Sequence, residues 1–145
     1  MSSAQWIWSH QCDIDSDMTV AHTVIQEVLQ QLTQLGWIPH DLFAVEMALE
    51  EAFANAVHHG NCDDPLKKVF FSCQLSENLI RIQIEDEGKG FNFDSVLDPR
   101  EPDNVERITG RGVCLICNFM SRVFYSECGK RIIMERDREI THPND

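Results

Sequence analysis

The chain has 145 residues, of which 43% are hydrophobic and 25% are charged, so it can bury a core and is not of a disordered composition. Its 12 basic and 24 acidic residues give a formal net charge of −12, which disfavours binding to nucleic acid or to an anionic membrane. There is no leader-like N-terminus and no apolar run of about 20 residues, so we expect a cytoplasmic protein with a single domain, 1–145.

The N-terminal part predicts a strand followed by a helix. Residues 6–14 favour an opening strand. Apolar residues then recur with helical period at Val20, Val24, Val28, Leu32 and Leu35. Ser16 or Asp17 can cap this helix, and Gly36 can end it.

A second helix is expected to begin at Pro39 and to continue to Gly60. Its core face is formed by Leu42, Val45, Leu49, Phe53 and Ala56. Glu51 and Asn55 are four residues apart and share a different face, whereas Glu50 points about 140° away from Asn55. A carboxylate and a carboxamide one turn apart suit a general base and a Mg²⁺ ligand, and a solvated polar face is the alternative.

The rest of the chain predicts two hairpins separated by a long connection and a third helix. The expected segments are strands 67–75 and 79–86, a connection 86–112, a helix 113–122, strands 123–127 and 131–137, and a polar tail 138–145. This order predicts an α+β sandwich of two layers. About three helices would cover one face of a mixed, mostly antiparallel sheet.

The stretch "DEGKGF" places glycines directly after a predicted strand end. Asp86 would end the strand, where its carboxylate can accept a hydrogen bond from an amine. Gly88 and Gly90 would allow the backbone to turn sharply and to approach a ligand. An ordinary acidic turn is the alternative.

The stretch "TGRGV" places a second pair of glycines, Gly110 and Gly112, just before the third predicted helix. Unpaired N–H groups at such a helix start can bind an anion. Arg111 lies between these glycines and Arg107 lies near them. No P-loop pattern is present.

The cysteines predict packing rather than chemistry. Cys114 and Cys117 would share one face of the third helix, and we expect them in the core. A metal site formed by His58, His59 and Cys62 is a remaining alternative.

The three motifs, in this order, resemble the Bergerat-type ATP fold of type II topoisomerases, heat-shock chaperones, histidine kinases and mismatch-repair ATPases. "EEAFANAVHHG" is similar to the asparagine box, and "DEGKGF" and "TGRGV" are similar to the two glycine boxes. Residues 92–108 would then be the ATP lid. The stand-alone form most resembles bacterial anti-sigma factors that act as serine/threonine kinases of anti-anti-sigma partners.

The resemblance implies a role for each matching residue, with ATP and Mg²⁺ as cofactors. Glu51 would be the general base, and Asn55 would coordinate Mg²⁺. The adenine amino group would bind Asp86, beside a wall shaped by Gly88 and Gly90. The phosphates would meet the backbone of Gly110, Arg111, Gly112 and Val113. Arg107, or else Arg111, would reach the γ-phosphate.

The resemblance also implies a homodimer, an anti-anti-sigma partner of the STAS type and a sigma factor. The sequence departs from the family in the last hairpin, where Gly129, Lys130 and Arg131 stand in place of a Gly-Thr-Thr pattern. Two alternatives remain open. One is a partner-switching nucleotide-binding module that transfers no phosphate, and the other is the ATP-binding half of a histidine kinase.

Overall fold

A computed structural model describes residues 5–88, 115–126 and 129–139 of the chain. Its five strands form one sheet in the order β1-β2-β3-β5-β4. The strands are β1 (Trp8–Asp15), β2 (Lys68–Leu75), β3 (Leu79–Asp86), β4 (Arg122–Tyr125) and β5 (Arg131–Asp137). Every pairing between neighbouring described strands is antiparallel.

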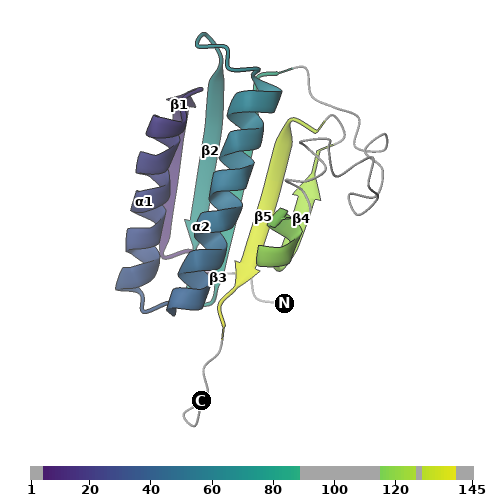
Figure 1. Cartoon of the computed structure of the whole chain (residues 1–145). Coiled ribbons are helices and arrows are strands. Elements are labelled where there is room, and N and C mark those ends of the chain that lie inside the picture. Colours follow the sequence, from purple (N-terminus) through teal and green to yellow (C-terminus); the bar gives the residue numbers. More distant parts are fainter. Residues whose placement is uncertain (1–4, 89–114, 127–128, 140–145) are drawn as a thin grey trace.

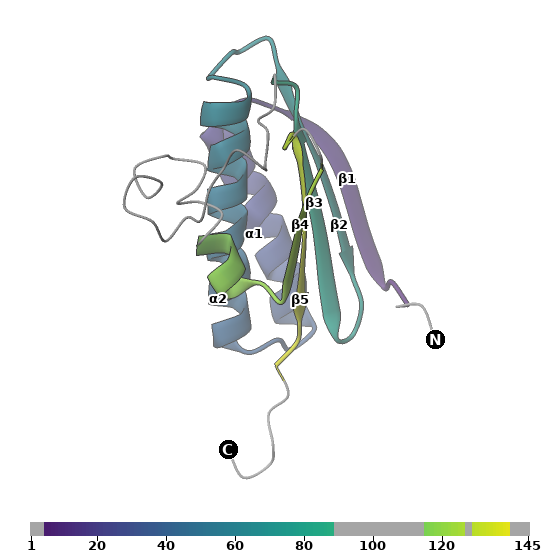
Figure 2. The same cartoon turned by 90° about the vertical axis from the view of Figure 1, so that its right-hand side faces the viewer.

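The helices lie on one face of this sheet, as Figure 2 shows in edge view. They are α1 (Met18–Gln34) and α2 (Pro39–Ala54), which continues directly into a π-helical turn, η1 (Asn55–Gly60). A short helical segment at residues 115–119 lies beside β4 and β5 (Figure 1). The predicted two-layer α+β architecture is therefore confirmed.

Local chemistry explains where α1 begins and ends. The Asp17 side chain accepts a hydrogen bond of 2.8 Å from the backbone N–H of Thr19, which caps the first turn. At the other end Gly36 has a φ of +80°, a left-handed conformation that glycine adopts at little cost. The sequence predicted both residues in these roles, with Ser16 as the alternative to Asp17.

The second helix has the predicted extent but changes its hydrogen-bonding pattern near its end. Pro39 occupies the first turn, where its missing N–H costs no helical bond. From Asn55 to Gly60 the helix is of the π type, and the Asn61 N–H still bonds to the Ala56 carbonyl five residues earlier, at 2.8 Å. Such π turns are often found at functional sites.

The core lies between the sheet and the two long helices. Along β2 and β3, buried and more exposed residues alternate, because successive side chains point to opposite faces of a strand. The rings of Phe53 on α2 and Phe71 on β2 stack with their centroids 5.5 Å apart. The opposite face of the sheet carries no helix in the described part of the chain.

The third predicted helix was drawn too long. Its described helical residues end at 119, and Arg122 is already the first residue of β4. The Ser121 N–H bonds to the Glu135 carbonyl, so this residue belongs to the sheet side of the turn. Cys117 is exposed, contrary to the expected core position, and Cys114 lies outside the described residues.

The predicted polar tail begins later than residue 138. The Arg138 guanidinium donates to the carbonyls of Leu35 and Glu77, and it lies 5.6 Å from the ring centre of Trp37. Glu139 donates its backbone N–H to Asp41. These two residues are part of the folded body. Within the described ranges, no helix has the length and apolar character that crossing a bilayer requires.

Candidate functional site

Glu51 and Asn55 lie on a flank of the second helix that is turned away from α1. The neighbouring Glu50 carboxylate reaches across to α1, where its Oε1 lies 3.4 Å from Nε2 of His22. At about 100° per residue, Glu51 and Asn55 then point to the other side of α2. Both are half-buried, and neither side chain makes a hydrogen bond within the described part of the chain. The Glu50–His22 contact agrees with the predicted separation of Glu50 from this pair, and the joint role of Glu51 and Asn55 stays a prediction.

The π turn brings the end of the second helix against the end of β3. Gly60, five residues after Asn55, is the last residue of η1. A Cβ added at Gly60 would lie 2.2 Å from Cγ of Asp86, so only glycine fits there without movement. Gly88 is packed as closely, because a Cβ there would lie 1.7 Å from the Gly60 carbonyl oxygen. Asp86 therefore lies about one helical turn from Asn55.

Asp86 is a buried carboxylate with one strong donor. Its side chain is on the helix-covered side, and only 8% of the residue is exposed. Burial raises the pKa of this carboxyl, while the Gly88 N–H, which donates to Oδ1 at 2.8 Å, lowers it. The other oxygen, Oδ2, accepts no hydrogen bond within the described ranges. A buried acceptor with remaining capacity is suited to bind a ligand amine.

Asn61 was missed by the sequence analysis, although it holds the surrounding loops together. It is fully buried, and its amide nitrogen donates to Ser16 Oγ at 2.7 Å and to the Lys68 carbonyl at 2.9 Å. Its amide oxygen accepts from the backbone N–H of Glu87 at 2.8 Å. The one signal in the sequence was a polar residue directly after a helix-ending glycine, which did not distinguish it from an ordinary loop residue.

Lys130, just before β5, lies directly opposite Asp86 at the end of the neighbouring strand β3. The register of β3 and β5 pairs Glu85 with Arg131, and the next bond joins the Asp86 N–H to the Lys130 carbonyl at 3.0 Å. The positive charge of Lys130 lowers the pKa of the Asp86 carboxyl. The residue that departs from the family pattern is thus a neighbour of the predicted base-binding residue.

The remaining predicted site residues lie outside the described part of the chain. They are Gly90, Arg107, Gly110, Arg111, Gly112 and Val113. The structure brings together Asn55, Gly88 and Asp86 at the same end of the sheet, with Glu51 one helical turn before Asn55. Phosphate binding by the second glycine motif stays a prediction.

The described residues Asn55 and Asp86 fit the ligands that the family resemblance implies, Mg²⁺ and the adenine of ATP. An amide oxygen such as that of Asn55 is a ligand that Mg²⁺ accepts, and a nearby buried carboxylate can orient an amino group. No three His, Cys, Asp or Glu side chains converge on one point within the described ranges. In the stretch considered as a metal site, His58 Nδ1 instead pairs with Asp63 Oδ1 at 2.5 Å.

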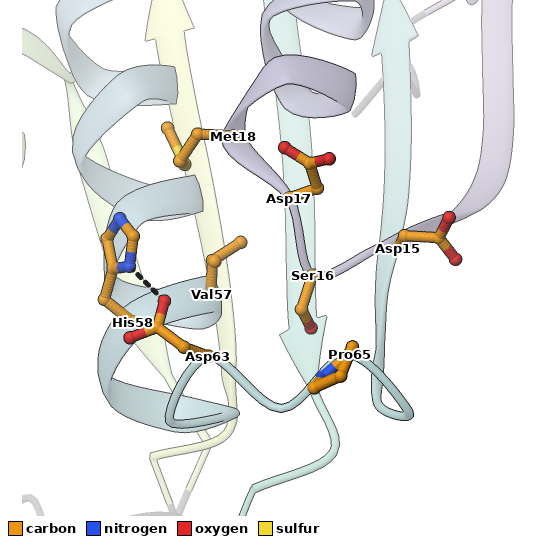
Figure 3. Close-up of a pocket in the computed structure, with 8 residues that line it drawn as sticks. All are labelled: Asp15, Ser16, Asp17, Met18, Val57, His58, Asp63 and Pro65. Atoms are coloured by element: carbon orange, nitrogen blue, oxygen red, sulfur yellow. Dashed lines mark hydrogen bonds and ion pairs between the residues drawn. The ribbon is translucent and has the colours of Figure 1, made fainter.

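A separate hollow of about 500 Å³ lies where the start of α1 meets η1 (Figure 3). It is lined by Asp15, Ser16, Asp17, Met18, Val57, His58, Asp63 and Pro65. None of the predicted catalytic or nucleotide-binding residues lines it. Its carboxylates come from the end of β1 (Asp15), the N-cap of α1 (Asp17) and the loop after η1 (Asp63), and no sequence motif joins these residues.

The two-layer fold and the glycine contacts around Asp86 fit an ATP-binding domain, and a family comparison assigns the class. Residues 14–136 match the model of the histidine kinase-like ATPase domain, and the chain belongs to this family.

Among similar proteins are several bacterial anti-sigma F factors. That of Oceanobacillus iheyensis is 34% identical over 97 residues, which cover 63% of this chain and 64% of the relative. That of Anoxybacillus flavithermus is 29% identical over 116 residues, covering 76% of this chain and 77% of the relative. The chain thus matches somewhat less than two thirds of the length of the first relative.

A solved structure shares the fold at low sequence identity. The crystal structure of the RsbU and RsbW domains of Rv1364c from Mycobacterium tuberculosis superposes with a TM-score of 0.60 at 16% identity. The match covers 94% of this chain and 33% of that chain. Such a likeness supports the architecture of the whole chain and says nothing of its substrate.

Proposed function

We propose that this chain is an ATP-dependent anti-sigma factor. It would transfer the γ-phosphate of ATP to a serine or threonine of an anti-anti-sigma partner of the STAS type, in the cytoplasm. The similarity to anti-sigma F factors supports this proposal, as does membership of the ATPase family. The observation that carries it is the arrangement at the end of the second helix. Glu50 is turned toward α1, which leaves Glu51 and Asn55 on another flank, and Gly60, five residues after Asn55, packs against the Asp86 carboxyl.

The proposed mechanism assigns each described residue one task. Asp86 binds the adenine amino group, and the Asn55 amide oxygen is a ligand for Mg²⁺, which neutralises charge on the phosphates. Glu51 accepts the proton of the partner's hydroxyl group while the oxygen of that hydroxyl bonds to the γ-phosphorus of ATP. The bond between this phosphorus and the leaving ADP breaks in the same step. Arg107, or Arg111, would stabilise the charge on the transferred group, with Gly90, Gly110, Gly112 and Val113 around the nucleotide.

Phosphate transfer to an anti-anti-sigma protein from labelled ATP tests this mechanism. We expect Glu51→Ala to lower the rate by about 100-fold or more, because the general base is lost. Glu50→Ala is the matched control, since this neighbouring carboxylate points toward His22 on α1. Its rate is expected to stay within about twofold. Equal loss in both variants would remove Glu51 from the role of base.

A second candidate is a nucleotide-binding module that switches partners without phosphate transfer. The observation in its favour is Lys130, which stands where the family has a threonine. In that case wild-type protein would bind ATP and the partner, yet the partner would carry no label.

A label that is stable to acid and lost in strong alkali would mark phosphoserine or phosphothreonine and would contradict the histidine kinase alternative.

A further inference from the structure

Lys130 and Asp86 form a cross-strand pair at the end of β3 where the base would bind. Resting on the proposed nucleotide site, we propose that Lys130 is an affinity-determining residue that holds Asp86 as a carboxylate for base recognition. Lys130 would act through Asp86 and is therefore a positioning residue rather than a catalytic one.

Backbone geometry places the two side chains on the same face of the sheet. The Asp86 N–H donates to the Lys130 carbonyl, so these residues are directly opposite each other in the extension of the β3–β5 ladder. Side chains alternate along a strand, and Ile132 and Met134 are buried on the helix-covered face. Lys130 has the same parity and is half-buried, whereas Arg131 points the other way and is exposed.

The surroundings of Asp86 explain why a cation is needed. Gly60 and Gly88 pack against the carboxyl so closely that neither could carry a Cβ without movement. This burial is the largest influence on the Asp86 pKa and raises it. The Gly88 N–H is the largest influence that lowers this pKa, and the charges of Lys130 and, more weakly, Lys67 lower it as well, while Glu85 on the same strand raises it. Lys130 is thus the main side-chain charge that opposes burial.

The consequence for binding has a definite sign. An ionised carboxylate accepts a hydrogen bond from an amino group more strongly than a neutral carboxyl does. Removing the Lys130 charge raises the pKa of Asp86, so at a pH near that pKa a larger share of the carboxyl is protonated. Nucleotide affinity should then fall as the pH falls, and should change little in alkaline solution.

The test is a titration of full-length protein with a fluorescent ATP analogue and Mg²⁺ at several values between about pH 5.5 and 8. The quantity of interest is the ratio of the dissociation constants of Lys130→Thr and wild type at each pH. Titration of the ATP phosphates is common to both proteins and cancels in this ratio. We expect the ratio to be at least about threefold larger at the acidic end than at the alkaline end.

Two controls separate the proposed role from a structural one. Arg131→Thr removes a neighbouring charge on the opposite face of the sheet. The ratio of the dissociation constants of this variant and wild type is expected not to change with pH. In an Asp86→Asn background, Lys130→Thr should also give a flat ratio, because the titrating group is absent. Lys130→Arg should restore the wild-type profile.

The outcomes distinguish this inference from the proposed function. A flat ratio for Lys130→Thr would overturn the inference while leaving nucleotide binding intact. Failure of the wild-type protein to bind the analogue at any pH would overturn the proposed function, and this inference with it.

Discussion

Asp41 shows how strongly one buried carboxylate can depend on its partners. The Asp41 side chain is fully buried, and the Arg136 Nε donates to its Oδ1 at 2.9 Å. Its Oδ2 accepts from the Glu139 N–H at 3.1 Å, while another nitrogen of Arg136 reaches the Phe119 carbonyl at 2.6 Å. This network joins the first turn of α2, the end of β5 and the helical segment 115–119. A buried charge left alone after removal of its partner is strongly destabilising.

We therefore predict that Asp41→Ala lowers the free energy of unfolding by about 3–5 kcal/mol, because Arg136 is left without its carboxylate. Urea denaturation followed by circular dichroism measures this difference. Asp137→Ala is the matched control, since Asp137 forms an exposed ion pair with Arg122 and should cost about 0–1 kcal/mol. Asp41→Asn, which keeps the shape and one acceptor, should fall between the two. An equal loss of unfolding free energy in the Asp41→Ala and Asp137→Ala variants would contradict the stabilising role of the buried Asp41–Arg136 pair.

At the level of elements, η1 determines how closely the second helix approaches β3. An α-helical continuation would rotate Gly60 relative to Asp86, because a π turn contains more residues than an α turn. The contact between Gly60 and the Asp86 carboxyl depends on this local widening and on the missing Cβ. The helix end and the strand end thus form one unit.

Gly60→Ala is expected to cost about 1–3 kcal/mol of stability, because the new methyl group must displace the Asp86 carboxyl. The same variant should weaken nucleotide binding about tenfold or more, as the displaced carboxyl no longer faces the base. Urea denaturation and the fluorescent titration measure the two effects.

Gly36→Ala serves as the reference for this test. It also strains the backbone, since Gly36 has a φ of +80°, but the added Cβ would be 3.5 Å from the nearest side-chain atom, on Arg138. We expect a loss of stability with unchanged nucleotide affinity, because this turn joins the opposite ends of the two helices. A parallel loss of affinity in both glycine variants would show that the Gly60 effect is general destabilisation.

At the scale of the whole molecule, β1 is one of the two edge strands of the described sheet, with β4 at the other edge. Next to β1, Ile7 is 53% exposed although its N–H bonds to the Leu75 carbonyl. An exposed apolar side chain beside an edge strand favours association with another chain. The proposed homodimer would cover this position.

Ile7→Lys is accordingly expected to shift the protein from twice 16.7 kDa toward 16.7 kDa in sedimentation equilibrium. The introduced charge would have to be buried in the interface. Leu66→Lys is the control, because Leu66 is 88% exposed and precedes Lys68, which pairs with Asp15 at the end of β1 opposite to Ile7. A protein that is monomeric before any substitution would contradict the dimer directly.

The fold was largely predictable because its signals are local. The alternation of apolar and polar residues predicted β3 with the observed limits. A capping residue, Asp17, and a glycine suited to a left-handed turn, Gly36, predicted the two ends of α1. The same holds for Glu51 and Asn55, whose shared face follows from a spacing of four. The third helix was overextended because apolar residues continue past residue 119, where tertiary bonds to β5 take over.

The parts that the sequence could not supply depend on contacts between distant segments. Hydrophobic period does not distinguish a π turn from an α turn over six residues, so η1 was read as ordinary helix. The buried roles of Asp41 and Asn61 depend on partners that are distant in the chain, such as Arg136 for Asp41, 95 residues away, and Ser16 for Asn61, 45 residues away. Polar residues with such partners look like surface residues when read alone.

The buried amide of Asn61 has a mechanical implication. One rigid planar group holds the entrance of α1, the first residue of β2 and the backbone just past Asp86 at fixed mutual spacing. If the segment after Asp86 is displaced, the turn at Ser16 must move with it, or a hydrogen bond of this fully buried amide is broken. The strand end that carries Asp86 and the start of α1 are thereby coupled through a single side chain.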